Sequence, residues 1–191
     1  ANLAHLLAIS GLHMGLLTGV VFSVLRGGLA LWPAVALRVP GKKIAALGAL
    51  AAGAVYLALS GGNVATVRAY VMVSVMLVAV LLDRRAISLR SVAIAATLIL
   101  LMTPEALSGP GFQMSFAATT ALVAAFAAIR GRRGRTWPRW VLAAGTVVLS
   151  SAVAGAATAP FAAAHFNRFT DYGLIANLAS VPLMGALVMP C

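Results

Sequence analysis

The chain has 191 residues, of which 62% are hydrophobic and only 9% are charged, and its mean hydropathy is +1.03. A soluble domain carries about 25% charged residues, so this composition excludes a disordered protein, a coiled coil and an ordinary cytosolic enzyme. It predicts an integral membrane protein, because so much apolar surface needs lipid around it. The net charge of +11 is typical of nucleic-acid-binding proteins, but cations also accumulate in the cytoplasmic loops of membrane proteins.

The two ends of the chain favour a piece of a longer protein. The chain starts at Ala1, a few residues before an apolar run, and stops at Cys191, at the end of another. We therefore expect residues 1–191 to be one membrane domain within that protein. Cys191 is the single cysteine, which excludes an intrachain disulfide and a cysteine-based metal cluster.

Apolar runs separated by breaks with charge, glycine or proline predict a polytopic all-α bundle of about seven helices. A helix that spans the hydrocarbon core needs about 20 residues. The fourth run is short and the seventh contains Pro182, so we expect either to be short, kinked or re-entrant. The runs lack the alternation that a β-barrel requires. In chain order they cover residues 12–32, 44–60, 63–82, 87–102, 112–129, 140–159 and 174–189.

Basic residues alternate along the breaks between these runs. In chain order the six breaks hold four, one, three, no, five and one lysines or arginines. Cytoplasmic loops carry the excess of positive charge, so the first, third and fifth breaks are predicted to be cytoplasmic and the N-terminus to be outside. This accounts for twelve of the fourteen cations. The arginine-rich break at 130–139 is then more typical of a cytoplasmic loop than of a nucleic-acid site.

Two cations, Arg68 and Arg168, remain on the predicted outer side. Other polar side chains gather in the outer half of the predicted bundle with them. They are Asn2, His5, Ser10, His13, Asn63, Gln113, Ser115, His165, Asn167, Asp171, Tyr172 and Asn177. An intramembrane polar cluster of this kind indicates transport or permeation.

Arg68 is the most informative of these residues. The 14 residues between Arg68 and Asp83 span about 21 Å as a helix, which is too short for a hydrocarbon core of about 30 Å. The helix must therefore begin near Asn63, and Arg68 lies about one turn inside the membrane. A cation there costs about 2.5 kcal/mol or more, so it faces a cavity or a partner, or its side chain extends back to the outer headgroups.

The histidines and acids make a poor catalytic set. His5 and His13 flank Ser10 and Gly11, and on a straight helix they would lie about 12 Å apart, too far to share a metal ion. They are equally typical of polar residues at a helix start. The chain has three acids, no two of them close in sequence, and no hydrolase or phosphate-loop motif. We therefore expect no catalytic residue, metal site or cofactor here. A membrane enzyme with a metal on His5, His13 and His165 is an alternative.

Two aromatic stretches have two interpretations each. Phe112 and Phe116 lie one turn apart beside Gln113 and Ser115, a spacing that suits helix packing or base stacking. The break at 160–173, predicted to be an outer loop, mixes aromatic residues with His165, Asn167 and Arg168. This pattern is typical of an interfacial aromatic belt, and it would also serve as a stacking and phosphate-binding surface for a single strand.

Five stretches together resemble a known family. They are residues 5–15 (HLLAISGLHMG), 60–69 (SGGNVATVRA), 81–86 (LLDRRA), 110–117 (PGFQMSFA) and 159–182 (APFAAAHFNRFTDYGLIANLASVP). In this order they resemble the competence domain of the ComEC family of DNA-uptake proteins, across nearly the whole chain. The first stretch is the most specific. Ala65 and the Pro110–Gly111 pair depart from the family pattern, which affects local loop shape.

The resemblance implies a channel in the bacterial inner membrane that passes single-stranded DNA inward during natural transformation. It also implies an outer oligonucleotide-binding domain before this region and a metallo-hydrolase domain after it, so no nuclease activity belongs to this segment. The implied partners are single-stranded DNA, membrane lipids, a DNA-receptor protein, a cytoplasmic motor protein and a second copy of the chain.

The resemblance and the polar outer end lead to one hypothesis about the DNA path. Cationic and imidazole side chains form an outer vestibule, and neutral polar groups line the path deeper in. A transporter of a small molecule or a lipid-linked substrate is the alternative. The path residues are His5, Ser10, His13, Arg68, Gln113, Ser115, His165, Asn167, Arg168 and Asn177.

Overall fold

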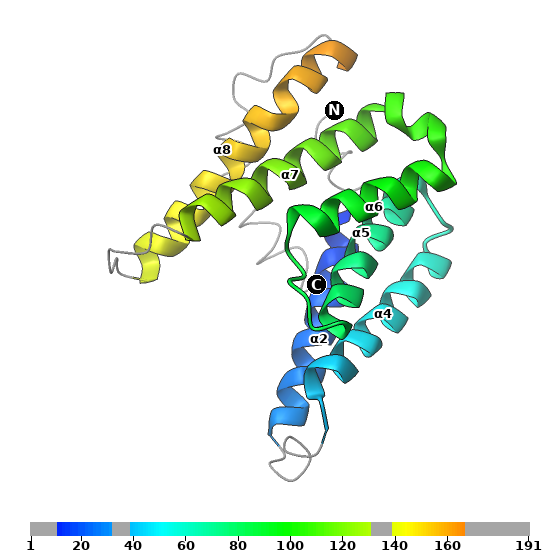
Figure 1. Ribbon diagram of the computed structural model, residues 1–191, viewed down its shortest axis with the longest axis vertical. Coiled ribbons are helices and arrows are strands. Elements are labelled where there is room, and N and C mark those ends of the chain that lie inside the picture. The colour runs from blue at the N-terminus through cyan, green and yellow to red at the C-terminus, as the bar shows by residue number, and fades with distance from the viewer. Residues whose placement is uncertain (1–10, 32–38, 131–138, 167–191) are drawn as a thin grey trace. The chain divides into compact units, whose positions relative to one another are not determined.

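The computed structural model describes residues 11–31, 39–130 and 139–166, and Figure 1 shows them as an assembly of helices. No strand occurs in these ranges. The chain divides into two compact units, residues 1–104 and 105–191. The helices are α2 (Gly11–Ala30), α4 (Gly41–Leu59), α5 (Val64–Leu81), α6 (Leu89–Met102), α7 (Pro110–Arg130) and α8 (Arg139–Phe166), with a 3-10 helix, η1, at Pro104–Ser108.

Five of the described helices are long and apolar enough to cross a membrane. Their candidate spans are His13–Ala30, Gly41–Leu59, Val64–Leu81, Pro110–Ile129 and Gly145–Phe166. The all-α membrane fold predicted from the sequence is confirmed. The expectation that the fourth run forms a short helix is confirmed, because α6 has 14 residues. The seventh run, at 174–189, lies outside the described residues.

The spans carry exposed aliphatic side chains where a soluble protein would carry polar ones. Val24, Leu47 and Val55 are 65%, 56% and 58% exposed. Contiguous apolar surface of this kind needs a hydrocarbon environment, and a helix that satisfies its own backbone hydrogen bonds is suited to it. These side chains therefore mark surfaces that face lipid.

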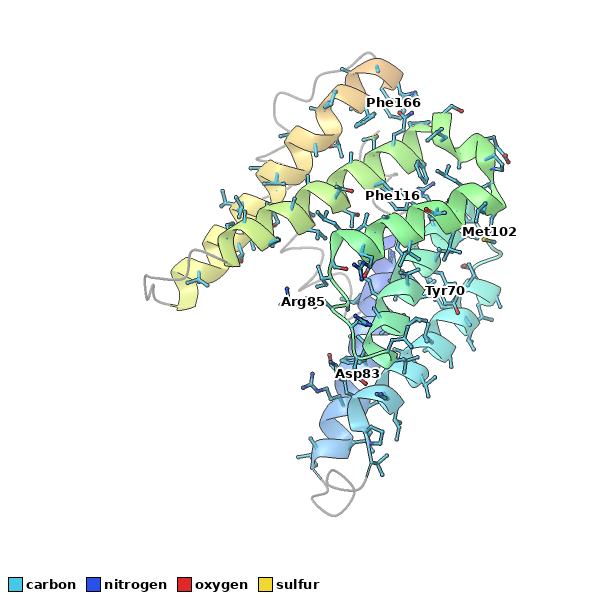
Figure 2. All side chains as sticks on the ribbon, viewed as in Figure 1. Tyr70, Asp83, Arg85, Met102, Phe116 and Phe166 are labelled. Atoms are coloured by element: carbon cyan, nitrogen blue, oxygen red, sulfur yellow. The ribbon has the colours of Figure 1, made fainter. Side chains whose placement is uncertain are left out.

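In the first unit, small residues bring three helices together. Ala45, Ala49 and Gly53 are buried at four-residue spacing along one face of α4, and α4 packs against both α2 and α5. A Cβ atom at Gly53 would lie 3.1 Å from Cγ2 of Thr18 on α2 and 3.1 Å from Cε2 of Tyr70 on α5. Helices in lipid associate through this kind of close van der Waals packing. Figure 2 labels Tyr70 on α5.

A tight turn joins α4 to α5. Gly61 and Gly62 have φ angles of 73° and 66°, a region that L side chains rarely adopt. Their amides donate to the carbonyls of Ala58 and Leu57 at 3.4 and 3.3 Å, and these bonds satisfy the end of α4. Oδ1 of Asn63 then accepts from the Ala65 amide at 3.1 Å and caps α5. The prediction that this helix begins near Asn63 is confirmed.

Asp83 ends α5 in a left-handed conformation with φ of 56°. The Arg84 amide donates to the Ala79 carbonyl at 2.7 Å, a helix end at which glycine is the usual residue. The Asp83 carboxylate has a partner, because its Oδ2 lies 2.7 Å from Nζ of Lys43 on α4. This hydrogen bond and the charge of Lys43 lower the pKa of Asp83. Figure 2 labels Asp83 beyond the end of α5.

In the second unit, α7 and α8 pack against each other as a helical pair (Figure 1). The predicted helix end at residue 159 is wrong, because α8 continues through Pro160 to Phe166. Proline removes one backbone donor, here the one that would bond to the Ala156 carbonyl, and membrane helices tolerate such a proline. The Thr158 hydroxyl donates to the Ala154 carbonyl at 2.9 Å, in the turn before Pro160. His165 is therefore in the last turn of a helix and not in a loop.

Replacing Gly53 with Leu should lower the unfolding free energy by about 1–3 kcal/mol, because the added side chain separates α4 from α2 and α5. Gly19→Leu is the matched control, since a Cβ atom at Gly19 meets nothing within 4 Å. Thermal unfolding of the detergent-solubilised protein measures both. Equal midpoints for the two variants would show that the Gly53 contact does not hold the unit together.

Replacing Asp83 with Asn should lower the thermal midpoint slightly, and this loss should disappear in a Lys43→Gln background. The pKa of Asp83 is lowered on folding, so the pair stabilises the protein above about pH 4, the ordinary range for an aspartate. That stability is lost as the pH falls through the lowered pKa, and Asp83→Asn should not show this loss. The measurement is the midpoint against pH, and parallel curves for both proteins would contradict the pairing.

Candidate functional site

The structure brings the start of α2 against the first turns of α5. A Cβ atom at Gly11 would lie 3.2 Å from Cβ of Ala69, and α2 packs against α5. Residues 11–15 of the first family stretch therefore meet the stretch at 60–69. Met14 and Thr66 are fully buried there, one on each helix. The predicted path residues His5 and Ser10 lie outside the described residues.

Among the described residues, three buried side-chain atoms lack a hydrogen-bond partner, and all three belong to α2 and α5. They are Nδ1 of His13, Oγ1 of Thr66 and Oγ of Ser74. Hydroxyls elsewhere in these helices bond back to their own helix, as Thr18 does to the Met14 carbonyl at 2.7 Å. A buried polar atom without a partner costs free energy, and functional sites are where such atoms are tolerated.

Arg68 is in the second turn of α5 and is half-buried. The only ion pair within residues 11–31, 39–130 and 139–166 is that of Lys43 with Asp83, so no described carboxylate neutralises Arg68. The depth inferred from the sequence fits a helix that begins at Val64. Arg68 is therefore a half-buried cation near the start of a candidate membrane span, a position where a cation usually faces a cavity or a partner.

In the second unit, two predicted path residues contact each other. Oε1 of Gln113 on α7 lies 2.8 Å from Nε2 of His165 on α8, and Nε2 of Gln113 donates to the Leu107 carbonyl at 2.9 Å. Gln113 is half-buried, and His165 is exposed. The sequence separation of 52 residues hid this pair. Both residues had been selected only as polar groups near the outer end.

Phe112 and Phe116 support the packing interpretation of their stretch. Their ring centroids are 4.5 Å apart at 39°, and the side chains are 7% and 8% exposed. Rings this buried stabilise the helix pair and are not free to stack on a base. The carbonyl of Ser115 accepts from the Thr119 hydroxyl at 2.7 Å.

Three further path residues, Asn167, Arg168 and Asn177, lie outside the described residues. Within the described part of the chain, no group of three or more His, Cys, Asp or Glu side chains is placed to hold a metal ion. The sequence analysis missed the two buried hydroxyls without partners, on Thr66 and Ser74, and the ion pair between Lys43 and Asp83. Thr66 and Ser74 share one face of α5 at eight-residue spacing, and this periodicity was the available signal.

Comparison with known proteins identifies the family. The profile of the Competence protein family matches residues 1–191. The chain belongs to this family. It is 27% identical over 190 residues to the ComE operon protein 3 of Bacillus subtilis (strain 168), an alignment that covers 99% of this chain and 22% of that protein. The chain thus spans about a fifth of the length of that relative. No solved structure matches it.

Replacing Thr66 with Val should raise the unfolding free energy by about 1–3 kcal/mol, because the change removes a buried hydroxyl that has no partner and keeps the side-chain shape. Thr97→Val is the control, since Thr97 is exposed and donates to the Ala93 carbonyl at 3.0 Å. Unfolding in detergent measures both. A destabilised Thr66→Val protein would mean that the hydroxyl has a bonding partner in the folded state.

Proposed function

We propose that this chain is the membrane part of a DNA-uptake channel and passes single-stranded DNA across the bacterial plasma membrane during natural transformation. The observation that carries the proposal is Arg68, a half-buried cation in a membrane helix for which no described carboxylate is a partner. Membership of the Competence protein family supplies the context. The proposal gives this segment a transport role and no catalytic one.

The charge distribution supports a direction for transport. Lys43 and Asp83 join the first and third predicted cytoplasmic breaks at one side of the unit, as the alternation of basic residues requires. The turn at Gly61 and Gly62 is then on the outer side, with Arg68 one turn inward from it. In this orientation the N-terminus is outside, and a strand meets Arg68 first and the lysines and arginines of the inner loops last.

The chemistry of Arg68 suits a substrate that carries phosphate groups. A phosphate of the strand binds a guanidinium through charge-assisted hydrogen bonds, and Arg68 offers one such contact. A lipid headgroup phosphate is chemically the same partner for a side chain that extends to the interface. If Arg68 binds DNA phosphates, its replacement should weaken DNA binding and uptake. If it binds lipid headgroups, its replacement should leave both unchanged.

Replacing Arg68 with Gln in the full-length protein should lower transformation by about tenfold or more, because one charge-assisted phosphate contact is lost. Arg90→Gln is the matched control, since Arg90 is exposed near the start of α6, on the predicted cytoplasmic side. Transformant counts at equal membrane levels of each protein are the measurement.

Binding of a labelled single strand to the purified full-length protein separates the two phosphate sources. The affinity of the wild type for the strand should fall steeply with salt. The slope of the logarithm of the binding constant against the logarithm of the salt concentration should be shallower by about one for Arg68→Gln. Unchanged transformation together with an unchanged slope would assign Arg68 to lipid headgroups and refute its role in the DNA path.

A further inference from the structure

The orientation of the Gln113 amide is determined by its neighbours. A backbone carbonyl only accepts hydrogen bonds, so the amide atom that lies 2.9 Å from the Leu107 oxygen must be the NH₂ group. The amide oxygen therefore faces His165, 2.8 Å from its Nε2 atom. This assignment follows from the chemistry of the carbonyl, and η1 (Pro104–Ser108) supplies that carbonyl.

The Gln113 amide oxygen determines which ring nitrogen of His165 carries the proton. An amide oxygen cannot donate, so Nε2 of His165 must be the donor in the 2.8 Å contact. In the neutral ring the other nitrogen, Nδ1, is then without a proton and is an acceptor. Within the described residues no hydrogen bond occupies Nδ1, and the His165 side chain is exposed.

We propose that Gln113 is a positioning residue that holds His165 as the Nε2–H tautomer and thereby presents Nδ1 as an acceptor to the bases of the passing strand. This rests on the proposed function and deepens it. A phosphate oxygen only accepts, so a neutral Nδ1 does not bind the backbone of the strand. Exocyclic amino groups of adenine, cytosine and guanine donate, and they are the complementary chemistry. His165 thus contacts bases, where Arg68 contacts phosphate.

A purely structural role for the pair is the alternative, in which the hydrogen bond only joins α7 to α8. His165→Gln separates the two roles. The glutamine amide nitrogen takes the place of the Nε2–H donor and keeps the bond to Gln113, but its one acceptor, Oε1, is on the same terminal carbon as that nitrogen and not at the position of Nδ1. Under the proposal His165→Gln loses uptake although the helix pair stays joined, and under a structural role it keeps uptake.

The first measurement is nitrogen-15 magnetic resonance on histidine-labelled full-length protein in lipid, with His165→Gln used to assign the His165 signals. We expect a protonated Nε2 and an unprotonated Nδ1 in the wild type at a pH where the ring is neutral, and a mixture of tautomers in Gln113→Leu. If Gln113→Leu fails to fold, Gln113→Met serves in its place. A wild-type Nδ1–H tautomer, or an unchanged tautomer without the Gln113 amide, overturns the positioning role.

The second measurement is transformation by the same variants at equal membrane levels. We expect His165→Gln and Gln113→Leu each to lower uptake by about tenfold, the factor for one lost hydrogen bond. Normal uptake in His165→Gln overturns the contact with the strand, whatever the tautomer. If Arg68→Gln also transforms normally, the proposed DNA path itself fails, and the tautomer measurement still reports on Gln113 separately.

Discussion

The close approach of three helices at Gly53 is the contact on which the first unit depends. A Cβ atom there would meet Thr18 and Tyr70 at 3.1 Å, so a larger residue would separate α4 from both neighbours. Lipid tails are as apolar as the helices, and small residues that allow close packing are therefore what holds such helices together. The close contact of Gly11 on α2 with Ala69 on α5 lies in the same packed unit.

Polar groups inside a membrane protein usually have partners, and this unit contains two exceptions. Arg68 has no described carboxylate near it, and the Thr66 and Ser74 hydroxyls are buried without partners. By contrast, Asp83 accepts a left-handed conformation and gains Lys43 as a partner at the other end of α5. The end of the helix at Asp83 is thus electrostatically satisfied, whereas the first turns carry Arg68 and Thr66 without described partners.

Much of the fold could be predicted from the sequence because hydropathy and basic residues report directly on membrane helices. The first six runs, the short α6 and the start of α5 at Asn63 followed from spacing, and the seventh run lies outside the described residues. The end of α8 did not, because Pro160 was taken as a helix stop, whereas a membrane helix can continue through a proline, as α8 does to Phe166. The Gln113–His165 pair and the Lys43–Asp83 pair depend on which helices are neighbours, and one sequence carries no signal for that. The candidate path residues were chosen from the sequence only because they are polar and lie near the predicted outer end. For the described ones, the structure shows which atoms have hydrogen-bond partners.

The most direct test of the account is photo-crosslinking of incoming DNA in competent cells. A benzoylphenylalanine at position 64 lies one turn from Arg68 on the same face of α5 and leaves that arginine intact. Val64 is 69% exposed, and Val55, 58% exposed on α4, provides the control position. Illumination during uptake should join the strand to position 64 and not to position 55. Equal yields at both positions, or none at position 64 while uptake proceeds, would contradict a DNA path along the outer end of α5.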